Sequence, residues 1–141
     1  MSGFLIDSNV LLDIATNDPH WSDWSATQLA ACANHGALII NPIIYTEVSV
    51  GFQRIEEVEI FLDSTMFRRD PLPYDAGFLA GKAFLAYRRR GGTKTSVLPD
   101  FYIGAHAAVS KLTLLTRDTA RYKTTYPTLT LIAPNMKRGL S

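Results

Sequence analysis

The chain has 141 residues, of which 47% are hydrophobic and 19% are charged, and its formal net charge is +1. These values exclude a disordered chain and a strongly basic nucleic-acid binder, so any contact with nucleic acid has to come from a local patch. Cys32 is the single cysteine, which excludes a disulfide framework within the chain and suits a reducing compartment.

The N-terminal stretch lacks the features of a signal peptide. No basic segment precedes its apolar residues, and Asp7 and Asp13 interrupt the apolar run. No apolar run approaches the ~20 residues that a membrane-spanning helix requires. We therefore expect a cytoplasmic protein with no membrane contact, in which residues 1–134 form a single domain and residues 135–141 form a polar C-terminal tail.

Short apolar strands alternate with amphipathic helices along the chain. Strands are expected at 3–6, 37–41, 66–70, 112–116 and 129–133, the third of them as a weak candidate for an edge strand. Helices are expected from Asn9 and over 20–36, 42–52, 55–64, 74–92 and 99–111, with a short helix or loop at 120–127. Such alternation predicts an α/β fold in which helices cover both faces of a parallel sheet.

Two acidic residues follow strands of this sheet. Asp7 follows the strand at 3–6, and Asp118 lies just past the strand at 112–116. Parallel sheets bind ligands outside the carboxyl ends of their strands, where the strand order reverses. If these two strands are neighbours, both carboxylates lie at one crevice. Taken alone, either acid could simply cap a helix or close an Asx turn.

Two further acids lie within expected helices. Asp100 follows Pro99 at a helix start, where an acid could simply complement the helix dipole, whereas a purely structural role is harder to assign to Glu47 in mid-helix. Glu47 borders the apolar stripe that contains Ile44, and Asp100 shares a helix face with Ile103 and Ala107. An acid at the margin of a core-facing stripe is costly unless it is paired or bound to a cation. Together with Asp7 and Asp118, these acids favour a hard divalent cation, Mg²⁺ or Mn²⁺.

A softer metal is disfavoured because Cys32 is isolated. His20, His35 and His106 also lack the spacing of metal ligands, and we interpret all three as structural.

Four segments, in this order and spacing, resemble the PIN domain, and most closely the VapC-type toxins of bacterial toxin–antitoxin pairs. They are FLIDSNVLLD, YTEVSVGF, LPDFYIGAHA and LLTRDTARY, and the likeness extends over residues 3–134 to the YPTLTLIAP ending. The resemblance implies a central five-stranded parallel sheet in a three-layer sandwich, a homodimer, and Mg²⁺-dependent endoribonuclease activity, with Mn²⁺ as a possible substitute.

At the matching positions, the resemblance implies a catalytic set of Asp7, Glu47, Asp100 and Asp118. The three aspartates are expected to contact metal directly or through water. Glu47 is either a further ligand or the residue that positions the attacking water. Attack by water predicts products with 5′-phosphate and 3′-hydroxyl ends. Whether one or two ions bind before the substrate is left open.

Small polar residues accompany the acids. Asn9 and Thr116 match the supporting positions of the family. Asp13 lies six residues after Asp7 and is expected on the far side of the first helix, so it is not assigned to the site and offers a control for substitutions at Asp7.

Substrate binding needs positive charge near the acids. The candidates for RNA contact are Arg88, Arg89, Arg90 and Lys94, shortly before Asp100, and Arg117 beside Asp118. Cations at the end of a helix also complement the helix dipole, so the first cluster has a structural interpretation of equal weight.

Other classes of protein fit less well. A phosphatase of the haloacid dehalogenase type requires a second acid two residues after Asp7, where this chain has Asn9. A response-regulator receiver requires paired acids near the start, and a structure-specific DNA nuclease of this fold requires additional helices. The alternative that remains is a non-catalytic PIN-like module that binds RNA or protein.

The resemblance also implies a cognate antitoxin as partner. The expected docking surface lies on the helix at 42–52, with Ile43, Tyr45 and Val50, and on the preceding helix, with Trp21 and Trp24. An amphipathic antitoxin segment on this surface is expected to direct a cation toward the acids, where it would compete with Mg²⁺.

Overall fold

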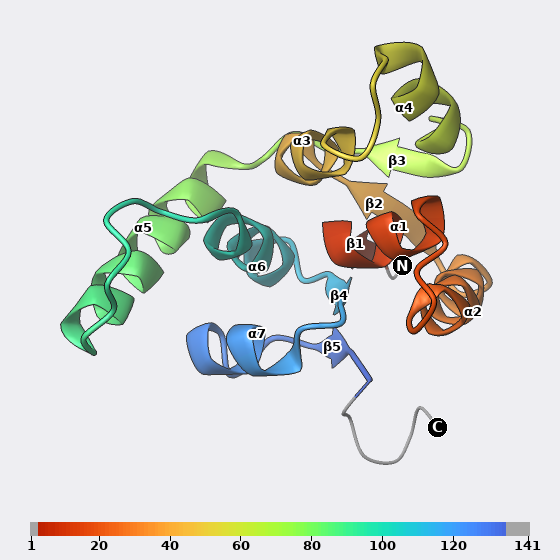
Figure 1. The fold of residues 1–141 in the computed structure, drawn as a ribbon. Helices are drawn as coiled ribbons and strands as arrows, with labels where there is room; N and C mark the ends of the chain where they lie inside the picture. The colour runs from red at the N-terminus through yellow and green to blue at the C-terminus, as the bar shows by residue number, and fades with distance from the viewer. Residues whose placement is uncertain (1–2, 135–141) are drawn as a thin grey trace.

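The computed structural model describes residues 3–134, which form a five-stranded parallel sheet with helices on both faces (Figure 1). The strand order is β3-β2-β1-β4-β5. The strands are β1 (Gly3–Ile6), β2 (Ala37–Ile40), β3 (Phe67–Arg69), β4 (Thr113–Leu115) and β5 (Leu131–Ile132). The α/β fold class and the five-stranded parallel sheet are confirmed, and the expected tail at 135–141 lies outside the described residues.

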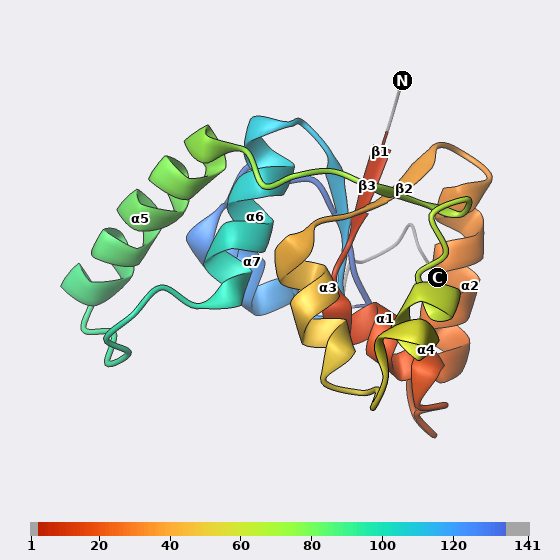
Figure 2. The ribbon, with the colours of Figure 1, turned by 90° about the horizontal axis from the view of Figure 1, so that it is seen from above.

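The helices form the outer layers of the sandwich. They are α1 (Ser8–Ala15), α2 (Ser22–Ala33), α3 (Pro42–Ser49), α4 (Ile55–Phe61), α5 (Tyr74–Arg89), α6 (Pro99–Val109) and α7 (Thr119–Thr125). Figure 2 shows α6 and α7 on one side of the sheet and α2 on the other, with α5 outside α6. Among residues 3–134, no helix combines the length and apolar character needed to cross a membrane.

The central strand explains why the chain begins with an uninterrupted apolar run. All of β1 is buried, because β2 and β4 flank it and helices cover both faces. A strand buried on both faces has no polar alternation, so Phe4, Leu5 and Ile6 are all part of the core. The edge strand β3 contrasts with it, since Arg68 and Arg69 are exposed there.

Three helices, α1, α3 and α7, begin just after strands and are capped by polar side chains. Asn41 accepts a hydrogen bond from the Ile44 backbone amide at 2.9 Å, and Pro42 occupies the first turn of α3. Asp7 caps α1, which begins at Ser8, one residue before the expected start. The segment expected as a short helix or loop forms α7, which Asp118 caps. The helices and strands are shorter than expected at most ends, by a few residues each, where regular hydrogen bonding frays.

The strand order reverses at β1, which pairs with β2 on one side and β4 on the other. The neighbour relation between β1 and β4 was the condition for bringing Asp7 and Asp118 together, and it is met. The Asp7 backbone amide donates to the Leu115 carbonyl at 2.9 Å, which holds the ends of the two strands side by side. The crevice expected for a ligand therefore lies beyond these two ends.

Candidate metal and nucleic-acid site

A pocket of about 370 Å³ opens at the carboxyl ends of β1 and β4. Four carboxylates line it: Asp7 follows β1, Glu47 comes from α3, Asp100 from the first turn of α6, and Asp118 precedes α7. Four separate elements thus bring together acids that are far apart in the sequence.

Asp7 lies deepest of the four, with 5% of its surface exposed. Its carboxylate accepts hydrogen bonds from the Ser8 amide at 2.8 Å and from the Thr116 hydroxyl at 2.7 Å. Burial nevertheless raises the pKa of Asp7 to about 6, and the charge of Glu47 adds to the effect, while hydrogen bonds from Thr116 and Tyr122 oppose it. A carboxylate whose ionised form is this costly is one that a nearby cation would stabilise.

Tyr122 closes the floor of the pocket beside Asp7. Burial raises the pKa of its phenol well above the usual value, and the charge of Asp7 acts in the same direction. The phenol therefore keeps its proton and serves Asp7 as a hydrogen-bond donor.

Glu47 is held by a neighbour of Asp7. The Ser8 hydroxyl donates to Glu47 Oε1 at 2.6 Å, which ties α3 to the first turn of α1. This short hydrogen bond fixes one carboxylate oxygen of Glu47 and leaves the other oxygen for a ligand or a water molecule.

Asp100 and Asp118 share a cation from the chain itself. Arg121 Nε lies 3.1 Å from Asp118 Oδ2 and 3.8 Å from Asp100 Oδ2. Burial raises the pKa of Asp100, and the charge of Arg121 acts against that rise. The outer half of the pocket is therefore partly neutralised, whereas the inner half around Asp7 is not.

The donor set is compatible with a hard divalent ion. The pocket presents carboxylate oxygens without a thiol or an imidazole, and Mg²⁺ needs only one or two of them because it retains several waters. Within residues 3–134, no three Asp, Glu, His or Cys side chains are close enough to hold an ion together. These residues thus fit a partly hydrated ion, not a closed cage of protein ligands.

The supporting residues form a clamp beneath the acids. Thr116 donates to Asp7 and accepts hydrogen bonds from the Asp118 amide at 3.0 Å and from the Asn9 side chain at 3.4 Å. Asn9 also accepts from the Arg117 amide at 3.2 Å. The turn after β4, which carries Asp118, is therefore fastened to the start of α1.

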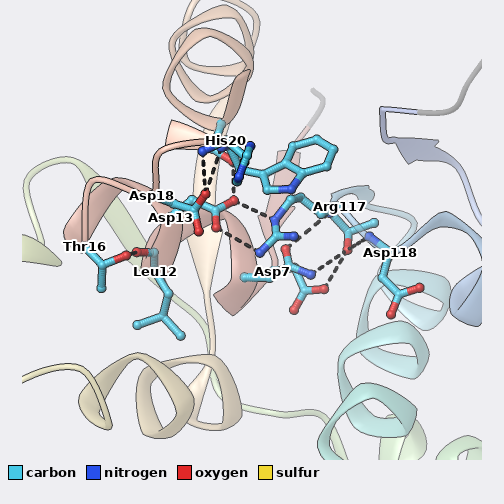
Figure 3. A network of polar contacts seen from close by, with 12 residues as sticks. Asp7, Leu12, Asp13, Thr16, Asp18, His20, Arg117 and Asp118 are labelled. Carbon is cyan, nitrogen blue, oxygen red and sulfur yellow. Dashed lines mark hydrogen bonds and ion pairs between the residues drawn. The ribbon is translucent and has the colours of Figure 1, made fainter. Parts of the chain in front are cut away.

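The Arg117 side chain contacts Asp13 and Trp21 and does not line the pocket. Its guanidinium donates to both oxygens of Asp13, at 2.7 and 2.9 Å, and lies over the ring of Trp21 at 5.0 Å from the centroid. Figure 3 shows Arg117 directed toward Asp13, while the Asp118 carboxylate lies on the other side of the turn. Asp13 therefore engages one edge of the guanidinium and Trp21 one face of it, and a contact of Arg117 with RNA stays a prediction.

Asp13 is likewise unsuitable as a control for Asp7. It is 2% exposed and also accepts a hydrogen bond from the Ser25 hydroxyl at 2.8 Å. The sequence predicted only that Asp13 lies on the far side of α1. It did not reveal the ion pair, because Arg117 lies more than a hundred residues away in the sequence.

A second hollow of about 630 Å³ adjoins the acidic pocket and shares Leu98, Asp100 and Arg121 with it. Arg90 and Lys94 line its outer part. Two of the expected RNA contacts therefore lie on a surface continuous with the acids.

The other two arginines of the cluster differ from each other. Arg88 donates to the Lys94 carbonyl at 2.7 Å and so shapes the loop after α5, while Arg89 is exposed.

Ser8, Arg121 and Tyr122 were not predicted as site residues. Ser8 adjoins Asp7, and Arg121 is three residues after Asp118 at an expected helix start, so their positions were visible in the sequence. The contact of Ser8 with Glu47 and the contact of Arg121 with Asp100 could not be predicted from the sequence. They depend on the packing of α1 against α3 and of α6 against α7.

The PIN domain family model matches residues 4–125, which is most of the chain, and the chain belongs to that family. Among curated proteins, no sequence matches it.

Solved structures with the same fold include VapBC2 from Rickettsia felis bound to a fragment of its promoter DNA. The two chains are 19% identical, the match covers 94% of this chain and 99% of that chain, and the TM-score is 0.73. VapBC-1 from nontypeable Haemophilus influenzae has 17% identity, covers 93% and 97% of the two chains, and has a TM-score of 0.68. A toxin–antitoxin complex from Klebsiella pneumoniae has 22% identity, covers 82% and 87%, and has a TM-score of 0.62. At these identities the likeness establishes a shared fold.

Proposed function

We propose that this protein is a divalent-metal-dependent endoribonuclease and the VapC-type toxin of a toxin–antitoxin pair. The observation that supports this most strongly is the convergence of Asp7, Glu47, Asp100 and Asp118 on one pocket of a PIN domain. Structures of similar fold include a toxin–antitoxin complex, which supports the biological role by analogy.

In this proposal Asp7, Asp100 and Asp118 would contact Mg²⁺ or Mn²⁺ directly or through water, and Glu47 would be either a further ligand or the residue that orients the attacking water. A divalent ion in such a site activates water and offsets charge on the leaving oxygen. Ser8 keeps Glu47 in position, and Thr116 and Tyr122 keep the Asp7 carboxylate oriented. Arg90 and Lys94 bind phosphates of the flanking RNA.

The test is cleavage of an end-labelled RNA pool by the purified chain, with Mg²⁺ or Mn²⁺ and with EDTA. We expect metal-dependent cuts with 5′-phosphate and 3′-hydroxyl ends. Asp7→Asn should lower the rate by at least ~100-fold, the scale for loss of a charge-stabilising contact. Its melting temperature should stay within about 4 °C, on the order of 1 kcal/mol, since the substitution removes a buried charge and not a large apolar contact.

Asp23→Asn is the matched control, because Asp23 is an exposed acid in the first turn of α2. Asp23→Asn should cut RNA like the parent. Full activity of Asp7→Asn in Mg²⁺ would show that the acids are not the catalytic set.

The alternative is a non-catalytic PIN-like binding module. In that case the chain would bind RNA or a protein partner and cut nothing in either metal. The same cleavage assay, read together with metal binding by calorimetry, distinguishes the two functions.

A further inference from the structure

Arg121 lies between the acidic pocket and the adjoining hollow, and it lines both. Its side chain is 59% exposed, so the guanidinium is accessible from solvent while its Nε contacts Asp118 and Asp100. Arg90 and Lys94 lie in the same outer hollow. Arg121 is therefore the cation that connects the carboxylates to the basic part of the surface.

Local helix geometry explains only one of its two contacts. Asp118 and Arg121 are three residues apart at the start of α7, where an exposed pair of this kind is common and contributes little stability. Asp100 comes from α6 and is 13% exposed, so its approach to Arg121 depends on the tertiary packing of α6 against α7. The same guanidinium thus neutralises two of the three carboxylates proposed to hold metal.

A guanidinium and a divalent ion beside the same carboxylates repel one another and compete for them. When an ion neutralises Asp100 and Asp118, Arg121 loses the charges that hold it. Its terminal nitrogens then provide a planar set of donors, which suits the oxygens of a phosphodiester.

We propose that Arg121 exchanges partners during the reaction: it pairs with Asp118 and Asp100 in the metal-free protein, and it binds a phosphate of the RNA once a divalent ion occupies the pocket. The inference rests on the proposed nuclease function for its substrate, whereas the exchange with metal can be measured without RNA.

The first experiment measures the binding of Mn²⁺ alone to the full chain by calorimetry. Arg121→Gln should bind Mn²⁺ several-fold more tightly than the parent, because the competing cation is gone, and Arg121→Lys should resemble the parent. Arg54→Gln is the matched control, since Arg54 is also exposed and pairs with a nearby acid, Glu56, at 3.5 Å. Unchanged or weaker Mn²⁺ binding by Arg121→Gln would overturn the exchange.

The second experiment measures the cleavage and the binding of RNA at saturating metal. Single-turnover cleavage by Arg121→Gln should fall ~100-fold, as for removal of a donor that stabilises developing charge, and Arg121→Lys should recover part of it. RNA affinity, measured by fluorescence anisotropy in Ca²⁺, should also fall for Arg121→Gln and not for Arg54→Gln.

The outcomes separate the roles. Tighter Mn²⁺ binding with full cleavage and RNA affinity would make Arg121 a competing cation only, which contradicts the substrate contact. Loss of both metal binding and cleavage would make it a residue that orients the acids, which also contradicts the proposal. A parent that binds RNA but cuts none would refute the nuclease function, and the Mn²⁺ and anisotropy measurements would still decide the role of Arg121.

Discussion

Asp7 and Asp13 are both buried near the start of the chain, yet their carboxylates have different environments. Asp13 is neutralised by Arg117 through paired hydrogen bonds and also bound by Ser25. Asp7 accepts hydrogen bonds from neutral donors, and among the described residues no ion pair reaches it. The first arrangement stabilises a fold, while the second leaves a charge that an added cation can stabilise.

The ion pair between Asp13 and Arg117 predicts that Asp13→Asn lowers the stability of the fold. The substitution leaves the Arg117 guanidinium with a neutral partner, so unfolding free energy should fall by on the order of 2 kcal/mol. This is below the ~3–5 kcal/mol typical of a fully buried pair, because Arg117 is 30% exposed. Urea denaturation measures the loss, with Asp23→Asn as control. A stability equal to that of the parent would contradict a structural role for the pair.

His106 predicts a pH dependence of stability. It is 1% exposed, and its Nδ1 accepts a hydrogen bond from the Asn41 amide at 2.9 Å. Burial lowers the pKa of His106 below 6.5, with Arg68 acting in the same direction and Asp70 against it. As the pH falls below 6.5 the unfolded chain therefore takes up a proton that the folded protein does not, and stability decreases with falling pH.

His106→Gln removes this titration while retaining an acceptor for Asn41. The stability advantage of the parent over His106→Gln should be largest above pH 6.5 and should shrink as the pH is lowered toward 5. The quantity to compare is the difference in unfolding free energy between the two proteins. The raised pKa of Asp7 makes the folded state more stable as the pH falls below 6, and this opposite effect is common to both proteins and cancels in the difference. A difference independent of pH would indicate that His106 does not titrate as its burial implies.

At the scale of elements, α5 and the loop after it supply the basic surface. The helix packs on α6, where Phe84 and Tyr87 contact the Phe101 ring edge-on. The Tyr87 hydroxyl accepts hydrogen bonds from the Thr93 and Lys94 amides, both at 3.2 Å. This anchoring positions Arg90 and Lys94 beside the acidic pocket.

The basic surface predicts a change in salt dependence. Replacing Arg88, Arg89 and Arg90 by Ala should weaken RNA binding, but Arg88 also supports the loop, so Arg89→Ala/Arg90→Ala is the sharper variant. Loss of two phosphate contacts should reduce the slope of log affinity against log salt by up to ~1.4. Arg54→Ala/Lys111→Ala is the control, because both cations are exposed and neither lines the acidic pocket or the adjoining hollow. Equal slopes for the two double variants would show that the cluster is a solvated helix end, and Mn²⁺ binding should be unchanged in both.

At the scale of the molecule, the proposed antitoxin surface is only partly available. Ile44 and Val48 of α3 are in the core, and Ile43, Tyr45 and Trp24 are half-buried against it. Val50, just after α3, is 85% exposed and remains a candidate contact. The homodimer implied by the family resemblance would cover further surface, and sedimentation of the purified chain tests it.

Co-expression with the product of an adjacent upstream gene tests the partner. We expect a stable complex in which nuclease activity is suppressed, and Val50→Ser should weaken the complex without lowering the melting temperature. Tyr74→Ser, at a residue that is 98% exposed on α5, should leave the complex intact. A chain that is harmless when expressed alone and co-purifies with no such protein would contradict the toxin role.

The sequence by itself determined the fold class and the order of elements. The alternation of short apolar runs with amphipathic segments is a local property of the sequence. The uninterrupted apolar run at Gly3–Ile6 is typical of a strand that is covered on both faces. Asp7 and Asp118, which follow two of the expected strands, were assigned to one crevice on the condition that those strands are neighbours, because parallel strands present their carboxyl ends at a common edge.

Only the tertiary structure decided which charges are neutralised and by what. Arg117 and Arg121 are four residues apart, and the sequence proposed a role in the site only for Arg117. The turn after β4 directs Arg117 to Asp13 on α1 and leaves Arg121 beside Asp118 and Asp100. Charge pairing depends on distances between elements far apart in the chain, and no local pattern of residues encodes those distances.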